Sequence, residues 1–459
     1  MRKLLLILST ALIFLWVACL SKKGLKSDAS AAQNPNIILI VADDLGYADV
    51  GFNGCTDIPT PNIDRIAKAG VVFSSGHVSF GVCSPSRAGL LTGRYQYRFG
   101  YERNPLYVTS DSTMGLPLSE ETMADVLGRS GYNNMIIGKW HLGAHPSLHP
   151  LKRGFNEFFG FLGGGHQYFP EKWTLQNPED ANGETESYRT KLNRNYTPVE
   201  ETEYITDAFS REAVSFVERN KTKPFFLYLA YNAPHGPLQA TEKYLNRFKN
   251  IKNPKRQTYA AMVSAVDDGV GNLLDKLKET GVIDNTIIVF LSDNGGPISD
   301  NASDNTPLRG QKGSVFEGGI RVPALLEWPA RYNAPIVIRA AASTSDYLPT
   351  ILSALNQPLP KELDGINLLP ILDGKRLRRQ SPLAFETIND SRGSPKLGWI
   401  EDRWKLLTNL DGKEEMLFDL DADPEESNNL AASQPRLASA LRAKLERWRA
   451  SCARSRQGL

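Results

Sequence analysis

Continuous apolar runs rich in β-branched residues are the feature that most constrains the fold of this chain. In the run at 36–42, every residue after Asn36 is apolar, so the run leaves no face for water. Strands of this kind are buried on both faces, as in parallel sheets covered by helices. Similar runs occur at 134–137, 225–230 and 286–291, with stretches of helical periodicity between them. The alternation predicts an α/β fold with a large, mostly parallel sheet flanked by helices.

The clearest helical pattern covers residues 259–280 and stops before Gly281. Its apolar residues recur at intervals of three and four, which places them on one face of a helix. A different composition marks residues 176–200, which are rich in Asn, Glu, Thr and Arg. We expect that segment to be a surface insertion.

The last part of the chain has shorter elements. Strand-like pieces at 383–385, 404–407 and 416–420 precede a helical pattern at 435–450. They predict a smaller C-terminal α+β domain with a short antiparallel sheet. The expected boundaries are 36–375 for the catalytic domain and 376–459 for the C-terminal domain.

The N-terminus has the pattern of an export signal. Two basic residues precede an apolar run from 4 to 18, which ends at Cys19. The run is shorter than the ~20 residues that span a bilayer. We expect a signal peptide at 1–19, of the lipoprotein type with lipid on Cys19, and a flexible tether at 20–35. The protein is then periplasmic or attached to the outer membrane or cell surface, with simple cleavage and release as the alternative.

Charge balance argues against a nucleic-acid partner. The chain has 53 Lys and Arg against 51 Asp and Glu, for a net charge of +2. Nucleic-acid-binding proteins normally carry a concentrated basic excess. The short basic run at 375–379 is expected to be a solvated loop.

The cysteines suggest one unusual thiol. If Cys19 carries lipid, Cys55, Cys83 and Cys452 remain, an odd number for an exported chain. One disulfide plus one special thiol is a natural interpretation, with pairing of Cys55 and Cys452 left open. The spacings match no zinc site.

Polar residues end four of the strand-like runs, where open α/β sheets bind their ligands. Two ends are acidic, Asp43-Asp44 and Asp293-Asn294. Adjacent buried carboxylates repel each other unless a cation lies between them, and oxygen ligands favour calcium or magnesium. A helix cap and a simple turn are the alternatives for either pair alone, but both pairs together favour a metal site.

Two of the six histidines directly follow strand-like runs. On the same edge of the sheet as a metal, His141 and His235 become candidates for proton transfer. The other four lack this context. Among them, His166, which follows three glycines, is the best candidate for a substrate contact.

A long motif at 83–94 resembles the signature of the type I sulfatases. It reads Cys-Ser-Pro-Ser-Arg-Ala-Gly-Leu-Leu-Thr-Gly-Arg, similar to that family's Cys/Ser-X-Pro-X-Arg followed by Thr-Gly-Arg. The resemblance implies that a formylglycine-generating enzyme oxidises Cys83 to formylglycine, an aldehyde. A disulfide-bonded or merely buried Cys83 is the alternative.

The resemblance covers nearly all of the chain after residue 35 and implies an alkaline-phosphatase-like (sulfatase) fold. It also implies a calcium ion held by five positions: Asp43, Asp44, Asp293, Asn294 and the modified Cys83. The hydrated aldehyde is a geminal diol, one hydroxyl of which attacks sulfur and displaces the alcohol. The other hydroxyl then loses its proton, which reforms the aldehyde and expels sulfate.

Further roles are implied by the same resemblance. Arg87 steadies the deprotonated diol, and Lys139 and Lys312 neutralise the sulfate oxygens. His141 acts as the base for elimination, and His235 protonates the leaving alcohol.

The substrate expected from this resemblance is a sulfated carbohydrate. Residues 98–105 and 160–169 resemble members that act on sulfated galactose or N-acetylgalactosamine units, although both can be structural loops. The rival functions are a phosphate or phosphonate ester hydrolase of the same superfamily and a non-catalytic binder of sulfated glycans. A Cys at position 83 and a single predicted calcium site disfavour the first, and the complete catalytic set disfavours the second.

Overall fold

The computed structural model describes residues 34–388 and 394–459, and residues 35–459 form one compact unit. The predicted signal peptide, 1–19, lies outside the described residues, as does the predicted tether, 20–35, except for its last two positions. Within the described ranges, every helix is too short or too polar to span a lipid bilayer.

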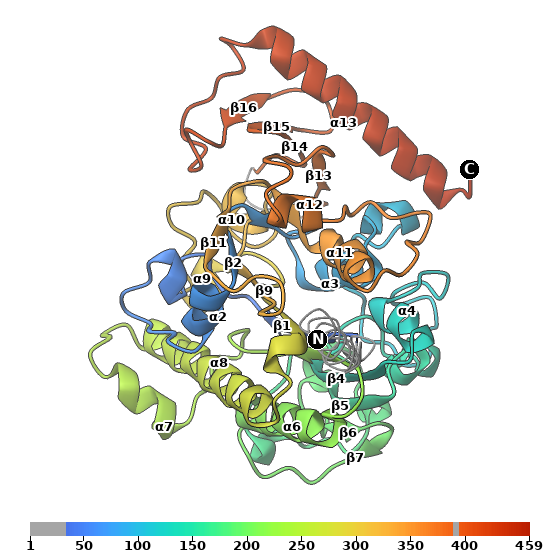
Figure 1. Ribbon diagram of the computed structural model, residues 1–459, viewed down its shortest axis with the longest axis vertical. Coiled ribbons are helices and arrows are strands. Elements are labelled where there is room, and N and C mark those ends of the chain that lie inside the picture. Colours follow the sequence, from blue (N-terminus) through green and yellow to red (C-terminus); the bar gives the residue numbers. More distant parts are fainter. Residues whose placement is uncertain (1–33, 389–393) are drawn as a thin grey trace, which may run out of the picture. The chain divides into compact units, whose positions relative to one another are not determined.

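A ten-stranded sheet forms the centre of the described unit (Figure 1). Its central strands are mutually parallel, in the order β9 (Thr286–Ser292), β1 (Asn36–Ala42), β8 (Phe225–Ala230), β4 (Asn133–Lys139) and β5 (Glu157–Phe161). The edges are mixed, with β10 (Ala324–Glu327), β2 (Val71–Phe73) and β11 (Ile336–Ile338) beyond β9, and β6 (Asn193–Arg194) and β7 (Thr197–Pro198) beyond β5. The predicted large, mostly parallel sheet is confirmed.

Helices cover both faces of this sheet, as the apolar strand β1 requires. Side chains of alternate β1 residues enter two separate cores, Ile37, Leu39 and Val41 on one face and their neighbours on the other. The first face packs against α3 (Cys83–Thr92), α4 (Met123–Arg129) and α11 (Tyr347–Ala354), and the second against α6 (Ile205–Asn220) and α8 (Pro254–Glu279). Each fully buried aliphatic side chain contributes about 1.5–3 kcal/mol, so β1 is held from both sides.

Helix α8 begins at Pro254, five residues before the predicted start at 259. The prediction began too late because the first turn of the helix is polar. Pro254 occupies the first helical position, and the Asn253 side chain accepts hydrogen bonds from the backbone of Lys255 (3.0 Å) and Arg256 (3.3 Å). Proline and an Asn cap are start signals in their own right. Apolar periodicity alone does not register them.

A second, smaller sheet follows in the chain and is antiparallel throughout. Its strands are β13 (Leu383–Glu386), β14 (Leu397–Glu401), β15 (Trp404–Thr408) and β16 (Met416–Asp419), and α13 (Pro435–Arg456) packs on one face. This confirms the predicted C-terminal α+β part. The division at 375/376 stays a prediction, since residues 35–459 form one unit.

A buried ion network, which we call the Glu317 network, joins the four-stranded sheet to the rest of the fold. It consists of His77 on β3 (Gly76–His77), Glu317 at the start of α10 (Glu317–Ile320), Lys405 on β15 and Glu426. The Lys405 ammonium lies 2.7 Å from Glu317 Oε1 and 2.8 Å from Glu426 Oε1. His77 Nε2 lies 3.0 Å from Glu317 Oε2.

The segment at 176–200 lies mostly at the surface, as predicted, but it also takes part in the fold. Its strands β6 and β7 extend the main sheet, and Ser187, Thr190 and Leu192 are buried. Polar composition alone does not indicate this, because the polar groups bond within the fold. The Ser187 hydroxyl, for example, donates to Glu184 O at 2.7 Å.

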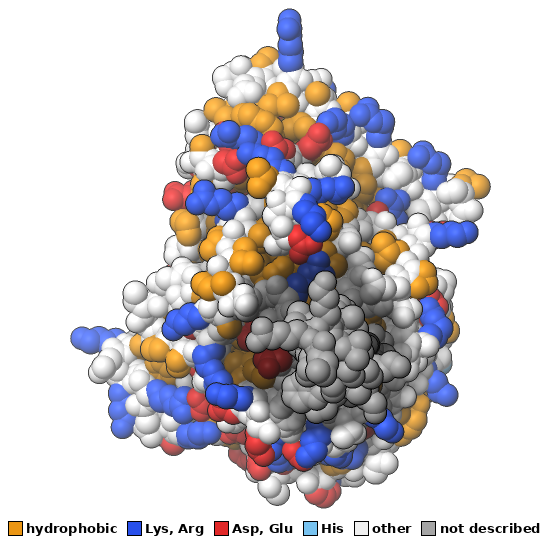
Figure 2. Space-filling view, viewed as in Figure 1, with side chains coloured by type: hydrophobic (Ala, Val, Ile, Leu, Met, Phe, Trp, Pro, Cys, Tyr) orange, Lys and Arg blue, Asp and Glu red, His pale blue; other side chains and the backbone are white. Residues whose placement is uncertain are grey.

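The basic run at 375–379 is only partly solvated. Lys375 and Leu377 are exposed, as expected for a solvated loop. Arg379 is instead buried in an ion pair with Asp346, so the prediction is wrong for this residue. On the face seen in Figure 2, basic and acidic side chains are interspersed rather than sorted by sign.

Cys55 and Cys452 do not pair, contrary to the natural interpretation of the cysteine count. Both are free thiols. Cys452 is buried among aromatic residues that include Tyr95 and Tyr97, whereas the Cys55 thiol is half-buried and lies 3.2 Å from Asp57 Oδ1. Each thiol is used as a packing group.

Candidate active site

Parallel register brings the polar strand ends to one edge of the sheet. Ala42 of β1 pairs with Ser292 of β9, so Asp43 and Asp293 leave neighbouring strands at the same level. The Asp293 backbone N–H donates to Ala42 O at 3.1 Å and fixes that alignment. Strands β8 and β4 align with β1 in the same way and deliver the other two ends.

Two of these ends adopt backbone conformations that side-chain-bearing residues rarely take. Asp44 has φ 65° and His141 has φ 56°. Left-handed conformations cost of order 1–3 kcal/mol and persist only where surrounding contacts hold them. The Asp44 N–H donates to Asp293 Oδ1 at 3.3 Å, and the Ser84 hydroxyl donates to the carbonyl of His141. Such strain at strand ends is common in active sites.

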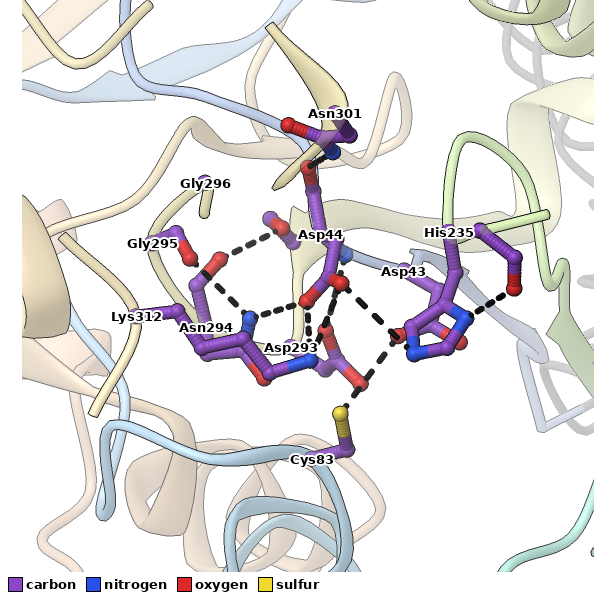
Figure 3. Close-up of polar contacts among 12 residues, drawn as sticks. Asp43, Asp44, Cys83, His235, Asp293, Asn294, Gly295, Gly296, Asn301 and Lys312 are labelled. Atoms are coloured by element: carbon purple, nitrogen blue, oxygen red, sulfur yellow. Dashed lines mark hydrogen bonds and ion pairs between the residues drawn. The ribbon is translucent and has the colours of Figure 1, made fainter. Parts of the chain in front are cut away.

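Three carboxylates converge beside Cys83 (Figure 3). Single oxygens of Asp43, Asp44 and Asp293 and the Cys83 sulfur all lie within 4.8 Å of one another. All four residues are buried.

Three side-chain cations balance these carboxylates. Lys139 Nζ lies 2.5 Å from Asp43 Oδ2, Arg87 Nη2 lies 2.7 Å from Asp293 Oδ2, and Lys312 Nζ lies 2.7 Å from Asp44 Oδ1. We call these six residues the strand-end cluster. Each carboxylate has its own cation, so the cluster has no net formal charge.

The carboxylates respond differently to burial. Burial and the neighbouring charge of Asp43 raise the pKa of Asp293 to about 6, because Arg87 only partly offsets them. Burial also opposes ionisation of Asp44, but the charges of Lys312 and His235 outweigh it and lower its pKa to about 2. A cation bound between these carboxylates would relieve their mutual repulsion.

The same residues fit a hard cation. The buried side-chain Oδ1 of Asn294 has no hydrogen-bond partner, while its amide nitrogen donates to Asp44 Oδ1 at 2.7 Å. An unpartnered buried oxygen next to three carboxylates is an incomplete ligand set, and its donors suit calcium or magnesium. A further residue that sequence did not single out, Asn301, braces the set by donating to Asp44 O at 3.2 Å.

Cys83 begins helix α3, and its sulfur lies 3.6 Å from Asp43 Oδ1. Burial raises the pKa of this thiol to about 12, because Lys139 and Lys312 offset only part of that effect. Nucleophilic attack requires the thiolate, which is then scarce at neutral pH. Unmodified Cys83 is therefore a poor nucleophile despite its central position.

The two strand-end histidines differ in their surroundings. His141 is buried, its Nδ1 has no partner, and burial together with Lys139 and Arg87 holds its pKa well below the usual range. His235 Nδ1 donates to Gly236 O at 2.6 Å, which leaves Nε2 3.7 Å from Asp44 Oδ2. Burial lowers the pKa of His235 to about 3, with Lys139 adding to the effect and Asp44 opposing it.

The site opens to solvent on one side. The side chains of Lys312 and His235 are 19% and 17% exposed, whereas those of Arg87 and Lys139 are fully covered. A ligand that reaches Cys83 therefore passes the first two residues.

His166 does not face the site, and its expected role as a substrate contact is wrong. It is fully buried, with Nδ1 2.9 Å from Gln167 O and Nε2 2.8 Å from Thr190 O. Its ring also packs on Phe161 and Trp173. From this region, Glu184 lies beside His141 across Gly164, and Tyr188 packs against the adjacent Gly165. The three glycines at 163–165 were the sequence signal for this approach.

Family comparison agrees with this geometry. The sulfatase family model matches residues 35–357. The chain belongs to the sulfatase family. The predicted enzyme class, a sulfuric ester hydrolase, is thereby confirmed. A model of the C-terminal region of N-sulphoglucosamine sulphohydrolase also matches this sulfatase, over residues 311–451.

Curated relatives are similar over most of the chain. N-acetylgalactosamine-6-sulfatase of Mus musculus is 36% identical over 377 residues, which cover 78% of this sulfatase and 70% of that protein. Arylsulfatase A of Homo sapiens is 32% identical over an alignment of 465 residues, which covers 91% of this sulfatase and 88% of that protein.

Solved structures share the whole architecture. Ps i-CgsB in complex with k-i-k-neocarrahexaose is 42% identical to this sulfatase with a TM-score of 0.85, over 91% of this chain and 93% of that one. The phosphonate monoester hydrolase of Agrobacterium radiobacter is 21% identical with a TM-score of 0.66, over 91% and 96%, a likeness of fold alone.

Proposed function

We propose that this sulfatase removes sulfate from sulfated carbohydrates, with formylglycine derived from Cys83 as nucleophile and calcium as metal. The observation that carries the proposal is the strand-end cluster around Cys83. Its three carboxylates and three cations cancel, and a divalent cation added to them leaves an excess of positive charge. A sulfate ester, which carries one negative charge, is attracted to that excess.

Asp43, Asp44, Asp293 and Asn294 are the residues that would hold calcium. When bound, calcium polarises oxygen atoms near it, and formylglycine supplies a hydrated aldehyde in place of an inert thiol. The high pKa of the Cys83 thiol supports such a modification, because the unmodified side chain is protonated at neutral pH.

Lys139 and Lys312 pair with different carboxylates and are proposed to contact sulfate oxygens. Their ammonium groups lie 2.5 Å from Asp43 and 2.7 Å from Asp44, so they are already fixed beside the carboxylates that surround Cys83. Fixed cations stabilise the charge of a transition state without having to reorganise. Arg87 is fully buried, lies 2.7 Å from Asp293 Oδ2, and is proposed to hold that carboxylate in place.

Proton transfer falls to the two histidines. His141 is buried with an open Nδ1 and is proposed as the base at the nucleophile. His235 is partly exposed at the opening, where the alcohol leaves, and is proposed as its proton donor. A bound sulfate ester offsets the charges of Lys139 and Lys312, which lower the pKa of His235, and so favours its protonated form.

The carbohydrate substrate is supported by relatives. N-acetylgalactosamine-6-sulfatase takes its name from a sulfated amino sugar, and Ps i-CgsB was solved with k-i-k-neocarrahexaose. The expected export signal at 1–19 and a lipid on Cys19 support action on material outside the cytoplasm, after maturation by a formylglycine-generating enzyme.

The test is sulfate release by protein co-produced with a formylglycine-generating enzyme, on sulfated galactose, N-acetylgalactosamine, glucosamine and fucose saccharides. Mass spectrometry of the peptide containing residue 83 reports conversion. We expect release from one saccharide class, and loss of that release on calcium chelation. Converted protein that releases no sulfate from any saccharide contradicts the proposal.

A further inference from the structure

The three glycines at 163–165 follow strand β5 after one residue, Leu162, and have a specific packing role. A Cβ atom added to Gly163 would lie 2.6 Å from Ser187 Oγ, too close for any side chain. The neighbouring helix α5 (Glu184–Ser187) therefore docks on bare backbone. The glycines allow a segment from 20 residues further along the chain to approach the catalytic edge of the sheet.

Gly164 lies between Glu184 and a proposed catalytic residue. A Cβ at Gly164 would be 2.5 Å from Glu184 Oε1 and 2.7 Å from His141 Nε2, so both atoms crowd the same point. The Gly164 N–H donates to Glu184 Oε1 at 2.8 Å, which fixes the carboxylate beside His141. Burial raises the pKa of Glu184, and the charge of Lys139 opposes that rise.

Gly165 makes room for Tyr188 in the same way. A Cβ there would lie 2.4 Å from Tyr188 Cζ and 2.6 Å from its hydroxyl. The Tyr188 side chain is half-buried. Because Gly165 is adjacent to Gly164, this contact brings the Tyr188 hydroxyl to the same glycine segment that contacts His141. Burial raises the pKa of Tyr188, and the charge of Glu184 raises it further.

We propose that Glu184 and Tyr188 bind hydroxyl groups of the sugar that carries the sulfate, and that Glu184 selects against a second anionic group on that sugar. The inference rests on the proposed function and specifies its substrate: a monosulfated sugar with free hydroxyls next to the ester.

The charges around the site explain the selection. With calcium bound, the strand-end cluster would have an excess of positive charge that attracts any anion, so it cannot distinguish one sulfate from two. Glu184 is a carboxylate outside the strand-end cluster, fixed by Gly164. It can accept hydrogen bonds from sugar hydroxyls, whereas a second sulfate in the same place meets a like charge.

The test compares Glu184→Gln and Tyr188→Phe with wild-type enzyme on monosulfated and disulfated galactose and on an aryl sulfate. Glutamine keeps the acceptor for Gly164 N–H and removes only the charge. Glu186→Gln is the matched control, because Glu186 lies on the same helix and pairs with exposed Arg189. Thermal melting checks that each variant is folded.

We expect Glu184→Gln to raise KM for the monosulfated sugar about tenfold, to leave the aryl sulfate unchanged, and to reduce the preference for mono- over disulfated sugar. Tyr188→Phe should raise KM for both sugars. An equal fall in kcat on the aryl sulfate would show that Glu184 positions His141 instead, and unchanged sugar kinetics would overturn the inference. Wild-type protein inactive on every substrate would overturn the proposed function itself.

Discussion

The strand-end cluster and the Glu317 network are both buried groups of alternating charge, yet they differ in how completely their atoms are paired. In the Glu317 network, both ring nitrogens of His77 are engaged, and Lys405 is shared between two carboxylates. Beside the strand-end cluster, Asn294 Oδ1 and His141 Nδ1 have no hydrogen-bond partner. Glu426 Oε1 of the Glu317 network also makes no hydrogen bond, but it has the Lys405 ammonium at 2.8 Å. Buried charge is therefore common to both regions, and the catalytic region is distinguished by neutral ligand atoms without a partner.

The two regions also differ in solvent access, which is greater at the catalytic site. The side chains of His77, Glu317, Lys405 and Glu426 are fully covered, whereas Lys312 and His235 are partly exposed. The pKa of Glu317 is held well below its usual range, because Lys405 and His77 outweigh the effect of burial. A fully buried network of this kind stabilises contact between the four-stranded sheet and the rest of the fold, whereas a site that is open to solvent can exchange ligands.

The largest expected effect comes from the nucleophile. Cys83→Ala should lower kcat/KM by at least about 10⁴-fold, as expected when a covalent nucleophile is removed. The melting temperature should change little, because the substitution removes one small buried atom and no ion pair. Sulfate release and thermal melting of the same preparation measure both. Near-normal turnover would show that another group attacks sulfur.

Breaking the Glu317 network should lower stability and leave turnover nearly unchanged, the reverse of the effect expected for Cys83→Ala. Lys405→Met leaves Glu317 and Glu426 buried without their cation, which should cost about 3–5 kcal/mol of unfolding free energy. Denaturant unfolding measures this loss, and kcat per folded molecule should remain close to that of wild type. Lys413→Met is the control, because the Lys413 side chain is 82% exposed. Lost activity without lost stability would remove the distinction between the two regions.

Removing the proposed proton donor should sharpen the comparison within the open cluster. His235→Ala should reduce turnover of sugar sulfates by about 10³-fold, the range of general acid catalysis. Aryl sulfates should suffer much less, because a phenolate leaves without protonation. The ratio of the two rates is the measurement. Equal losses on both substrates would argue against the assigned role.

The gain in stability on calcium binding should be the smallest of these effects, and it should depend on the strand-end cluster and not on the Glu317 network. At a calcium concentration 100 times Kd, the folded state should gain about 2.7 kcal/mol, measured as a rise in melting temperature. The double variant Asp43→Asn/Asp293→Asn should lose this shift, and Lys405→Met should keep it. A shift that persists in the double variant would place the ion elsewhere.

Sequence was sufficient for the parts that depend on local pattern. The apolar run at 36–42 predicted a strand buried on both faces, and its structure agrees residue for residue as β1. The motif at 83–94 indicated the family. Both signals are contiguous, because an all-apolar strand has few alternatives and the motif concentrates its chemistry in one helix.

Tertiary structure alone decided the rest. It showed that Arg379 is buried, that His166 bonds only to the backbone, and that residues from 176–200 reach the catalytic edge. In each case a polar side chain found its partner far along the chain, and no local period records such a pairing. The sequence by itself therefore determined which chemistry this protein carries, and the fold decided which polar residues surround it, because burial of a polar group depends on partners that only folding brings together.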